Sequence, residues 1–497
     1  MNLDLSQLAA LGGALGATLV TVPRGRVLPL LGFGLLGLAT AGLGRALIGD
    51  DDFKLLFTEP SGLALVAAGT AAAVAGAIVF ARYPEIVPVA LIALAPFRIP
   101  IRLGEEDAFL LLPLYLVLTS AVLALAWQMA RGQRPAAPPY LLAIPIAALV
   151  TFAAVSFLWT WDERRGAISL AFFIFPFVAG FGVVARAPIA SWLSRALLVS
   201  LVALGCVFAA IGLWQAHTRT LFFAPSLEVA NAYTTFFRVT SLFKDPSLYG
   251  RYLVFPIVLL LVILLFRRNS SIEWISVTGL IALLFAGLFY SYSQSSFVAL
   301  FVVAAGIAFL AADRRSRLIL AACAIIAALA AGAFAAQTVG GRSARDITSG
   351  RSRLTSITLD AFKLRPIAGV GIGGQPQASA DATGRRSANR NASHTTPLTV
   401  LAELGIIGFA LYAWLLAAAA WALVLVTRRD RTLGVGLSAI LLAVFVHSLL
   451  YAGFFEDPLT WGVFGLSAAV LAAIPAAREE GVSAHDAASA TPKLLAH

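Results

Sequence analysis

Charged side chains are scarce in this chain of 497 residues. Asp, Glu, Lys and Arg make up 12% of it, roughly half of their share in an ordinary soluble domain. Hydrophobic residues reach 60%, which leaves too few polar side chains for a surface that faces water. The composition excludes a water-soluble globular protein and indicates one whose solvent is largely the lipid bilayer.

Cysteine is nearly absent as well. The only two cysteines, Cys206 and Cys323, both lie within apolar stretches. They provide neither a disulfide framework nor a cysteine metal site, and thiol redox chemistry is excluded. The five histidines are also too scattered along the sequence to predict a metal triad.

Long apolar runs are abundant, and most can cross about 30 Å of hydrocarbon as a helix. We predict an all-α, polytopic transmembrane bundle of about 12 to 15 spans. The candidate runs are Leu5–Val22, Val27–Ile48, Leu63–Phe80, Ile86–Phe97, Ala108–Ala130, Pro139–Trp161, Ala167–Val184, Leu193–Trp214, Tyr252–Phe266, Trp274–Tyr292, Phe297–Ala312, Leu318–Ala336, Leu398–Val426, Leu433–Tyr451 and Leu459–Ile474.

Positive charge in the short connections indicates the orientation of the bundle. Lys and Arg concentrate in alternate connections, which the positive-inside tendency assigns to the cytoplasm. Both long connections then lie on the outer face. The expected organisation is N-terminal transmembrane helices at 1–214, a first long outer loop at 215–251, central helices at 252–336, a second long outer loop with an amphipathic helix at 337–397, C-terminal helices at 398–477 and a cytoplasmic tail at 478–497.

The two long outer loops are strongly basic. Their Lys and Arg residues far outnumber their acidic residues, so the outer face should attract anions. Apolar residues at helical spacing predict an amphipathic helix from Arg351 to Arg365. The glycine-rich stretch at 369–374 lacks the flanking strand and helix of a dinucleotide fingerprint, so a nucleotide site is not expected there.

One histidine stands where the second long loop meets the next apolar run. This residue, His394, is followed by the stretch Thr395-Thr396-Pro397. Its imidazole can accept a proton near neutral pH and act as a general base, although spacing alone favours a capping or surface role. By contrast, His447 lies inside an apolar run, where we expect a hydrogen-bonded core residue.

Several blocks resemble, in order, the O-antigen ligase and Wzy-type polysaccharide polymerase superfamily of bacterial membrane glycosyltransferases. The resemblance covers roughly residues 238–451 and is most specific in its last block. The similar blocks are RVTSLFKDPSLYGRYL at 238–253, SYSQSS at 291–296, Gly350-Arg351 with RPIAGVG at 365–371, and the stretch from His394 to Gly408 that contains Glu-Leu-Gly.

The resemblance implies a GT-C-like fold in the cytoplasmic membrane and a reaction on its extracytoplasmic face. A glycan would pass, with inversion, from an undecaprenyl-diphosphate carrier to a hydroxyl of a glycan or lipid-anchored acceptor, without metal or other cofactor and without a nucleic acid partner. His394 would deprotonate or orient the acceptor, while Arg251 and Arg351 would bind the diphosphate. Second-rank candidates for the diphosphate are Arg238, Lys244 and Arg353.

One position departs from the family pattern. Where the family often has an arginine in its Ser-Arg turn, this chain has Gln294, whose amide can form hydrogen bonds but carries no charge. Other cations must then supply more of the charge compensation. Glu403, inside the Glu-Leu-Gly block, is a possible supporting residue that orients His394 or an arginine.

Two alternatives stay open. A transporter or flippase of a lipid-linked glycan or another anionic substrate would also have many spans and basic outer loops. Ion-coupled transport usually relies on carboxylates inside the spans, and here the acidic residues fall mainly in loops, tails and span ends. Within the enzyme class, polymerase and ligase differ only in the acceptor, which the sequence does not reveal.

Overall fold

The computed structural model describes residues 4–48, 57–103, 106–234, 236–267, 270–317, 351–384 and 392–473. Within these ranges, 11 helices are long and apolar enough to cross a membrane, which confirms the predicted polytopic helical bundle. The described residues also contain one antiparallel hairpin, β1 (Ile99–Leu103) and β2 (Glu106–Leu110). The hairpin is a departure from the purely helical prediction, and it covers the start of the run expected from Ala108.

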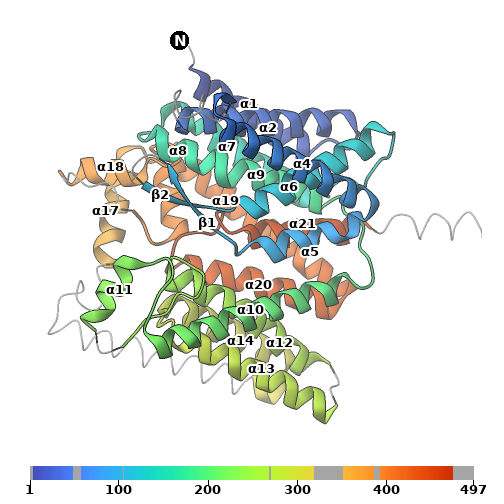
Figure 1. Cartoon of the computed structure of the whole chain (residues 1–497), viewed down its shortest axis with the longest axis vertical. Helices are drawn as coiled ribbons and strands as arrows, with labels where there is room; N and C mark the ends of the chain where they lie inside the picture. The colour runs from blue at the N-terminus through green and yellow to red at the C-terminus, as the bar shows by residue number, and fades with distance from the viewer. Residues whose placement is uncertain are drawn as a thin grey trace, which may run out of the picture.

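The N-terminal helices form one layered group (Figure 1). Helices α1 and α2 pack closely because Gly16 and Gly32 face each other: a Cβ on Gly32 would lie 2.7 Å from the Val20 nitrogen. Small residues permit such close helix contact in membranes. The group comprises α1 (Leu5–Thr21), α2 (Val27–Ile48), α4 (Pro60–Arg82), α6 (Leu112–Ala130), α7 (Tyr140–Val155), η2 (Ser156–Trp159), α8 (Glu163–Ser169), η3 (Leu170–Ile174) and α9 (Phe175–Val184).

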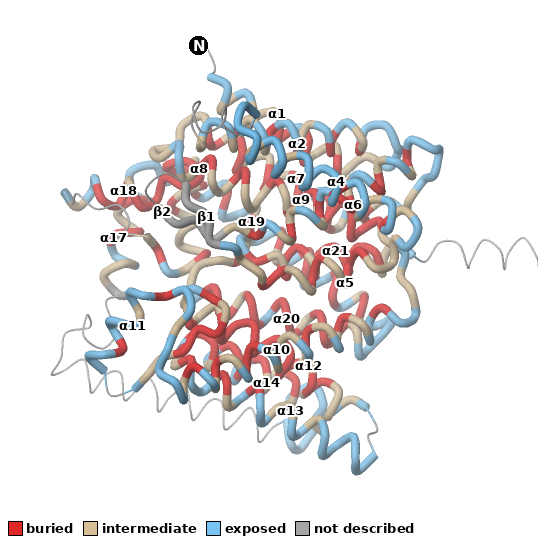
Figure 2. Tube along the Cα trace, in the orientation of Figure 1, coloured by how far each residue is buried: buried red, intermediate tan, exposed pale blue. Residues whose placement is uncertain are grey.

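A second group contains the central helices and α20. Helix α12 is its buried centre, whereas α13 turns most of its length outward (Figure 2). The outward residues include Ile272 and Ile275, which are 78% and 68% exposed and suit contact with lipid. The group comprises α10 (Leu193–Thr218), α12 (Pro246–Phe266), α13 (Ser271–Phe289), α14 (Gln294–Ala311) and α20 (Arg431–Ser448).

Three further helices connect the two groups. Helix α19 (Thr396–Arg429) contacts both α7 and α20, α21 (Pro458–Ala472) contacts both α9 and α20, and α5 (Val87–Leu94) contacts α6 and α10. The 3-10 turn η1 (Pro84–Ile86) precedes α5, so the short run expected at Ile86–Phe97 forms only a short helix. These connections make the loops around α5, α19 and α21 the place where both groups meet.

Helix α19 is interrupted near its start. Gly405 has φ 64° and ψ −164°, a conformation open essentially to glycine alone. The interruption frees backbone groups, and the preceding loop satisfies them. The Ile406 N–H donates to the Pro366 carbonyl at 2.9 Å, and the Gly371 N–H donates to the Glu403 carbonyl at 2.8 Å. The glycine-rich stretch therefore fixes the first turns of α19.

The short elements gather at one end of the bundle, together with the hairpin and α8 (Figure 1). They are α11 (Pro225–Ala232), α17 (Arg351–Leu364) and α18 (Gln375–Ala382). Helix α17 confirms the helix predicted from the apolar spacing. The expected span Leu318–Ala336 and the tail at 478–497 lie outside the described residues.

The first long loop is shorter than the sequence suggested. Helix α12 begins at Pro246, because the Asp245 side chain accepts a hydrogen bond from the Ser247 N–H at 2.6 Å and proline suits the first helical position. Lys244 thus lies just before the helix, whereas Arg251 lies within it.

Candidate functional site

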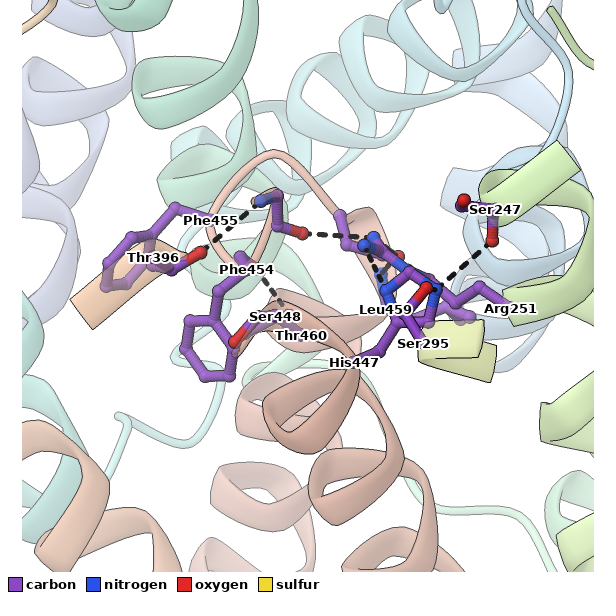
Figure 3. A network of polar contacts seen from close by, with 12 residues as sticks. Ser247, Arg251, Ser295, Thr396, His447, Ser448, Phe454, Phe455, Leu459 and Thr460 are labelled. Carbon is purple, nitrogen blue, oxygen red and sulfur yellow. Dashed lines mark hydrogen bonds and ion pairs between the residues drawn. The ribbon is translucent and has the colours of Figure 1, made fainter. Parts of the chain in front are cut away.

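Arg251 is the centre of a buried polar network (Figure 3). Its side chain is only 2% exposed and forms a salt bridge with Asp457, at 2.9 Å between Nη1 and Oδ2. The same nitrogen donates to the Gly453 carbonyl at 3.0 Å. Asp457 also caps α21 by accepting from the Leu459 N–H. Arg251 therefore ties α12 to the loop between α20 and α21.

His447 extends this network toward α14. Its Nδ1 accepts from the Arg251 guanidinium at 2.9 and 3.2 Å. Its Nε2 lies 3.2 Å from the Ser247 carbonyl and 3.1 Å from the Ser295 hydroxyl. Because a carbonyl only accepts, the Nε2 position carries the proton. His447 is 1% exposed, so the prediction of a hydrogen-bonded core histidine is confirmed.

His394 lies in the segment before α19, next to the loop between α20 and α21. The segment before it is held by the Ser393 N–H, which donates to the Gln375 side chain of α18 at 2.9 Å. The segment after it is held by Thr396, whose hydroxyl accepts from the Gly453 N–H at 3.3 Å (Figure 3). His394 itself is exposed to solvent, as access by a substrate would require.

One aromatic ring connects His394 with Arg251. The Tyr451 ring centroid lies 6.5 Å from that of His394 and 5.6 Å from that of His447. The Arg251 guanidinium carbon lies 5.8 Å from the same Tyr451 ring. Two candidates that are 143 positions apart in the sequence are therefore brought together around Tyr451.

The Tyr451 hydroxyl is surrounded by charged groups. Burial raises its pKa, and the Asp245 carboxylate, with which it is hydrogen-bonded, raises it further. The Arg251 and Arg98 guanidinium groups act in the opposite direction. No sequence pattern indicated a functional role for Tyr451, Arg98 or Asp457. The only local signal was Asp457-Pro458, a typical helix start.

Two basic candidates lie before α12. Lys244 is exposed and adjacent to Asp245. Arg238 is half-buried, and its Nε donates to the Ser291 carbonyl at 3.3 Å. Burial lowers the pKa of Arg238, while the nearby Asp245 raises it. Both residues thus lie at the entrance to the buried network, and Arg238 contacts the serine-rich turn.

Gln294 is the first residue of α14 and is exposed. The serines around it point inward instead: Ser295 and Ser296 are at most 2% exposed and contact His447. The position at which the family often has an arginine thus faces outward, and the buried contacts of this turn are made by hydroxyl groups.

Helix α17 carries two of the arginines predicted to bind the diphosphate, Arg351 and Arg353. Arg353 is half-buried and lies one helical turn before Ile357, whose carbonyl accepts from the Ser379 hydroxyl of α18 at 3.1 Å. Because residues four positions apart lie on the same face of a helix, Arg353 lies on the face of α17 that packs on α18. The Arg351 side chain lies outside the described residues, so its role stays a prediction.

Glu403 supports the glycine-rich stretch. Its carboxylate accepts hydrogen bonds from the Gly373 and Gln375 backbone N–H groups, which fixes the start of α18. The carboxylate also lines a cavity of about 80 Å³ together with Glu456, Thr399 and the aromatic residues Phe173, Phe455 and Trp461. Glu456 is partly exposed, but the surrounding protein desolvates its carboxyl group and raises its pKa.

No group of three or more His, Cys, Asp and Glu side chains suited to a metal ion is found among the residues that the structure describes. The arrangement offers instead an exposed imidazole, several guanidinium groups and two carboxylates around one loop. These groups can bind an anion and accept a proton, which are the elements of a group transfer from a phosphorylated donor.

Comparison with known proteins agrees with this chemistry. Residues 279–413 match the family model described as O-Antigen ligase. This segment contains the serine-rich turn, α17, the glycine-rich stretch and His394. The search of curated proteins found no match to the chain. The family match supports an integral membrane enzyme that transfers a glycan, and over residues 279–413 it confirms the resemblance to the O-antigen ligase and Wzy-type polymerase superfamily that was seen in the sequence.

Proposed function

We propose that the protein transfers a glycan from an undecaprenyl-diphosphate carrier to an acceptor hydroxyl on the outer face of the cytoplasmic membrane. The observation that carries the proposal is the position of Tyr451, whose ring centroid lies 6.5 Å from that of the exposed His394 and 5.8 Å from the guanidinium carbon of the buried Arg251. The family match over residues 279–413 supports the same reaction class.

In the proposed reaction, His394 accepts the proton of the acceptor hydroxyl as its oxygen attacks the anomeric carbon. The bond between that carbon and the phosphate oxygen breaks, and the lipid diphosphate leaves with the electron pair. Attack from the opposite face inverts the configuration. Guanidinium groups stay protonated and bind phosphate oxygens in a fork, so they stabilise the charge that develops on the leaving group.

Arg251 has a more indirect role in this proposal than the sequence suggested. Its donors are directed to Asp457, His447 and the Gly453 carbonyl. Gly453 in turn bonds Thr396, two residues after His394. Arg251 therefore positions His394 through this loop and contributes positive potential, while direct contact with phosphate falls to the less buried cations such as Arg238 and Lys244, together with Arg351 and Arg353.

Purified protein in liposomes with a lipid-linked repeat and an acceptor tests the proposal. The wild type should form a glycan product, and His394→Ala should not. His217, an exposed histidine at the end of α10, provides the matched control, because His217→Ala should retain the activity. Movement of the lipid-linked glycan across the bilayer without product would contradict the proposal and favour a flippase.

The same assay separates the two acceptor classes. A ladder of products from one defined repeat indicates a polymerase, whose acceptor is another lipid-linked glycan. A single addition to a lipid-anchored acceptor indicates a ligase. Both outcomes use the same leaving group and base.

A further inference from the structure

Arg98 lies beside the candidate site, although it is far from the family blocks in the sequence. It follows α5 and directly precedes β1. Its neighbour Phe97 packs on Phe208, with ring centroids 6.2 Å apart, and Phe208 packs on Phe243 at 5.1 Å. Phe243 then stacks on Tyr252 at 5.3 Å. This series of aromatic contacts holds the Arg98 segment against α12, next to Arg251.

The Arg98 guanidinium lies near the loop between α20 and α21, which Arg251 also contacts. It lies within electrostatic range of both the Tyr451 hydroxyl and the Glu456 carboxyl. Tyr451 is the residue whose ring contacts His394 and Arg251. Arg98, Arg251 and His394 come from distant parts of the sequence. All three therefore lie near the same tyrosine, Tyr451.

The guanidinium groups of Arg251 and Arg98 differ in their hydrogen-bond partners. The Arg251 guanidinium is buried and bonded to Asp457, His447 and a carbonyl. Arg98 is half-buried, and within the described ranges it has neither a hydrogen bond nor an ion pair; Glu456 acts on it only at longer range. A half-buried guanidinium without a bonded acceptor keeps its donors available for an anionic ligand.

We propose that Arg98 binds the diphosphate of the lipid-linked donor and supplies the charge that Gln294 lacks. The proposal rests on the proposed transferase function and extends its donor site to the N-terminal helices. The diphosphate would lie near Tyr451, between Arg98 and the entrance cations Arg238 and Lys244. The N-terminal helices would then take part in donor recognition as well as in anchoring.

Binding of undecaprenyl diphosphate, which carries no glycan, tests this role apart from catalysis. The full-length protein is placed in nanodiscs, and the Kd of this lipid is measured for the wild type, Arg98→Gln and Arg98→Lys. One charge-assisted contact corresponds to an affinity loss of about 10- to 100-fold, which we expect for Arg98→Gln. Arg98→Lys keeps the charge without the fork and should give an intermediate loss.

Transfer kinetics on the same variants separate donor binding from a structural role. Arg98→Gln should raise the KM for the lipid-linked donor and leave the KM for the acceptor unchanged. Arg164→Gln provides the matched control, because Arg164 is an exposed arginine at the start of α8 and should bind the donor like the wild type.

The outcomes that overturn the inference are distinct from failure of the proposed function. A wild type that transfers glycan, together with an Arg98→Gln variant of unchanged donor affinity, would overturn the role of Arg98 alone. An equal rise in donor and acceptor KM would also overturn it, because that result indicates a structural role. A wild type that neither binds undecaprenyl diphosphate nor forms product would refute the proposed function itself.

Discussion

The side chains of Arg251 and Asp457 form a salt bridge, and each also makes further contacts that hold the surrounding structure. Both are 2% exposed, so each charge depends on the other for compensation. Asp457 also caps α21, and Arg251 also bonds His447. A buried pair of this kind contributes more to defining one loop conformation than to net stability, but removing one partner leaves an uncompensated charge.

Asp457→Ala should therefore lower the free energy of unfolding by about 3–5 kcal/mol. Denaturation of the purified protein in detergent measures this change. The matched control is Asp360→Ala on α17, which removes a solvent-exposed pair with Lys363 and should change stability little. A small effect of Asp457→Ala would show that the pair is not the centre of the network.

The raised pKa of Glu456 predicts that the stability of the protein depends on pH. Desolvation raises the pKa of its carboxyl group in the folded state, so the folded protein holds this proton more tightly than the unfolded chain. Stability is then lost as the pH rises from about 4.5 through the raised pKa. Glu456→Gln should raise the Tm at pH 8 and leave it nearly unchanged at pH 4. An equal shift of Tm at both values would contradict this explanation.

At the scale of elements, the interrupted helix α19 is the structure on which His394 depends. The interruption at Gly405 lets the loop at 366–371 pair with the free backbone groups of α19. Thr396, at the first turn, then bonds the loop that carries Tyr451. The orientation of His394 therefore depends on backbone geometry nearly three helical turns away.

Gly405→Ala tests this dependence. A side chain at φ 64° is strained, and its Cβ would lie 2.3 Å from the Ile367 carbonyl oxygen. The strained backbone alone should cost about 1–3 kcal/mol, and glycan transfer should fall with it. Gly306→Ala is the control, since a Cβ at Gly306 in α14 meets nothing within 4 Å and alanine favours a helix. Equal stability and activity of the two variants would contradict a structural role for the interruption.

Apolar runs predicted most elements because each span must satisfy its backbone within one helix. The spacing of α17 and the buried position of His447 were predicted for similarly local reasons. The start of α12 was placed too late, because the hydrophobic run hid the cap at Asp245-Pro246. The hairpin, Arg98 and Tyr451 depend on contacts between segments far apart in the chain, and a single sequence carries no such information.

At the scale of the molecule, two helix groups share one loop region. Helices α5, α19 and α21 connect them, and the short elements cover the same end of the bundle (Figure 1). The connecting helix α5 leads to Arg98, the N-terminal group contributes the cavity wall beside Glu403, and the second group contributes Arg251 and His447. The proposed site is therefore assembled from both groups of helices.

The central claim is that this shared site transfers a glycan with His394 as its base. The most direct test is the initial rate of product formation from an undecaprenyl-diphosphate-linked repeat by equal amounts of folded wild type, His394→Ala and His217→Ala. We predict that the rate falls at least about 100-fold in His394→Ala and stays near wild type in His217→Ala. A His394→Ala variant that forms product at the wild-type rate would contradict the claim.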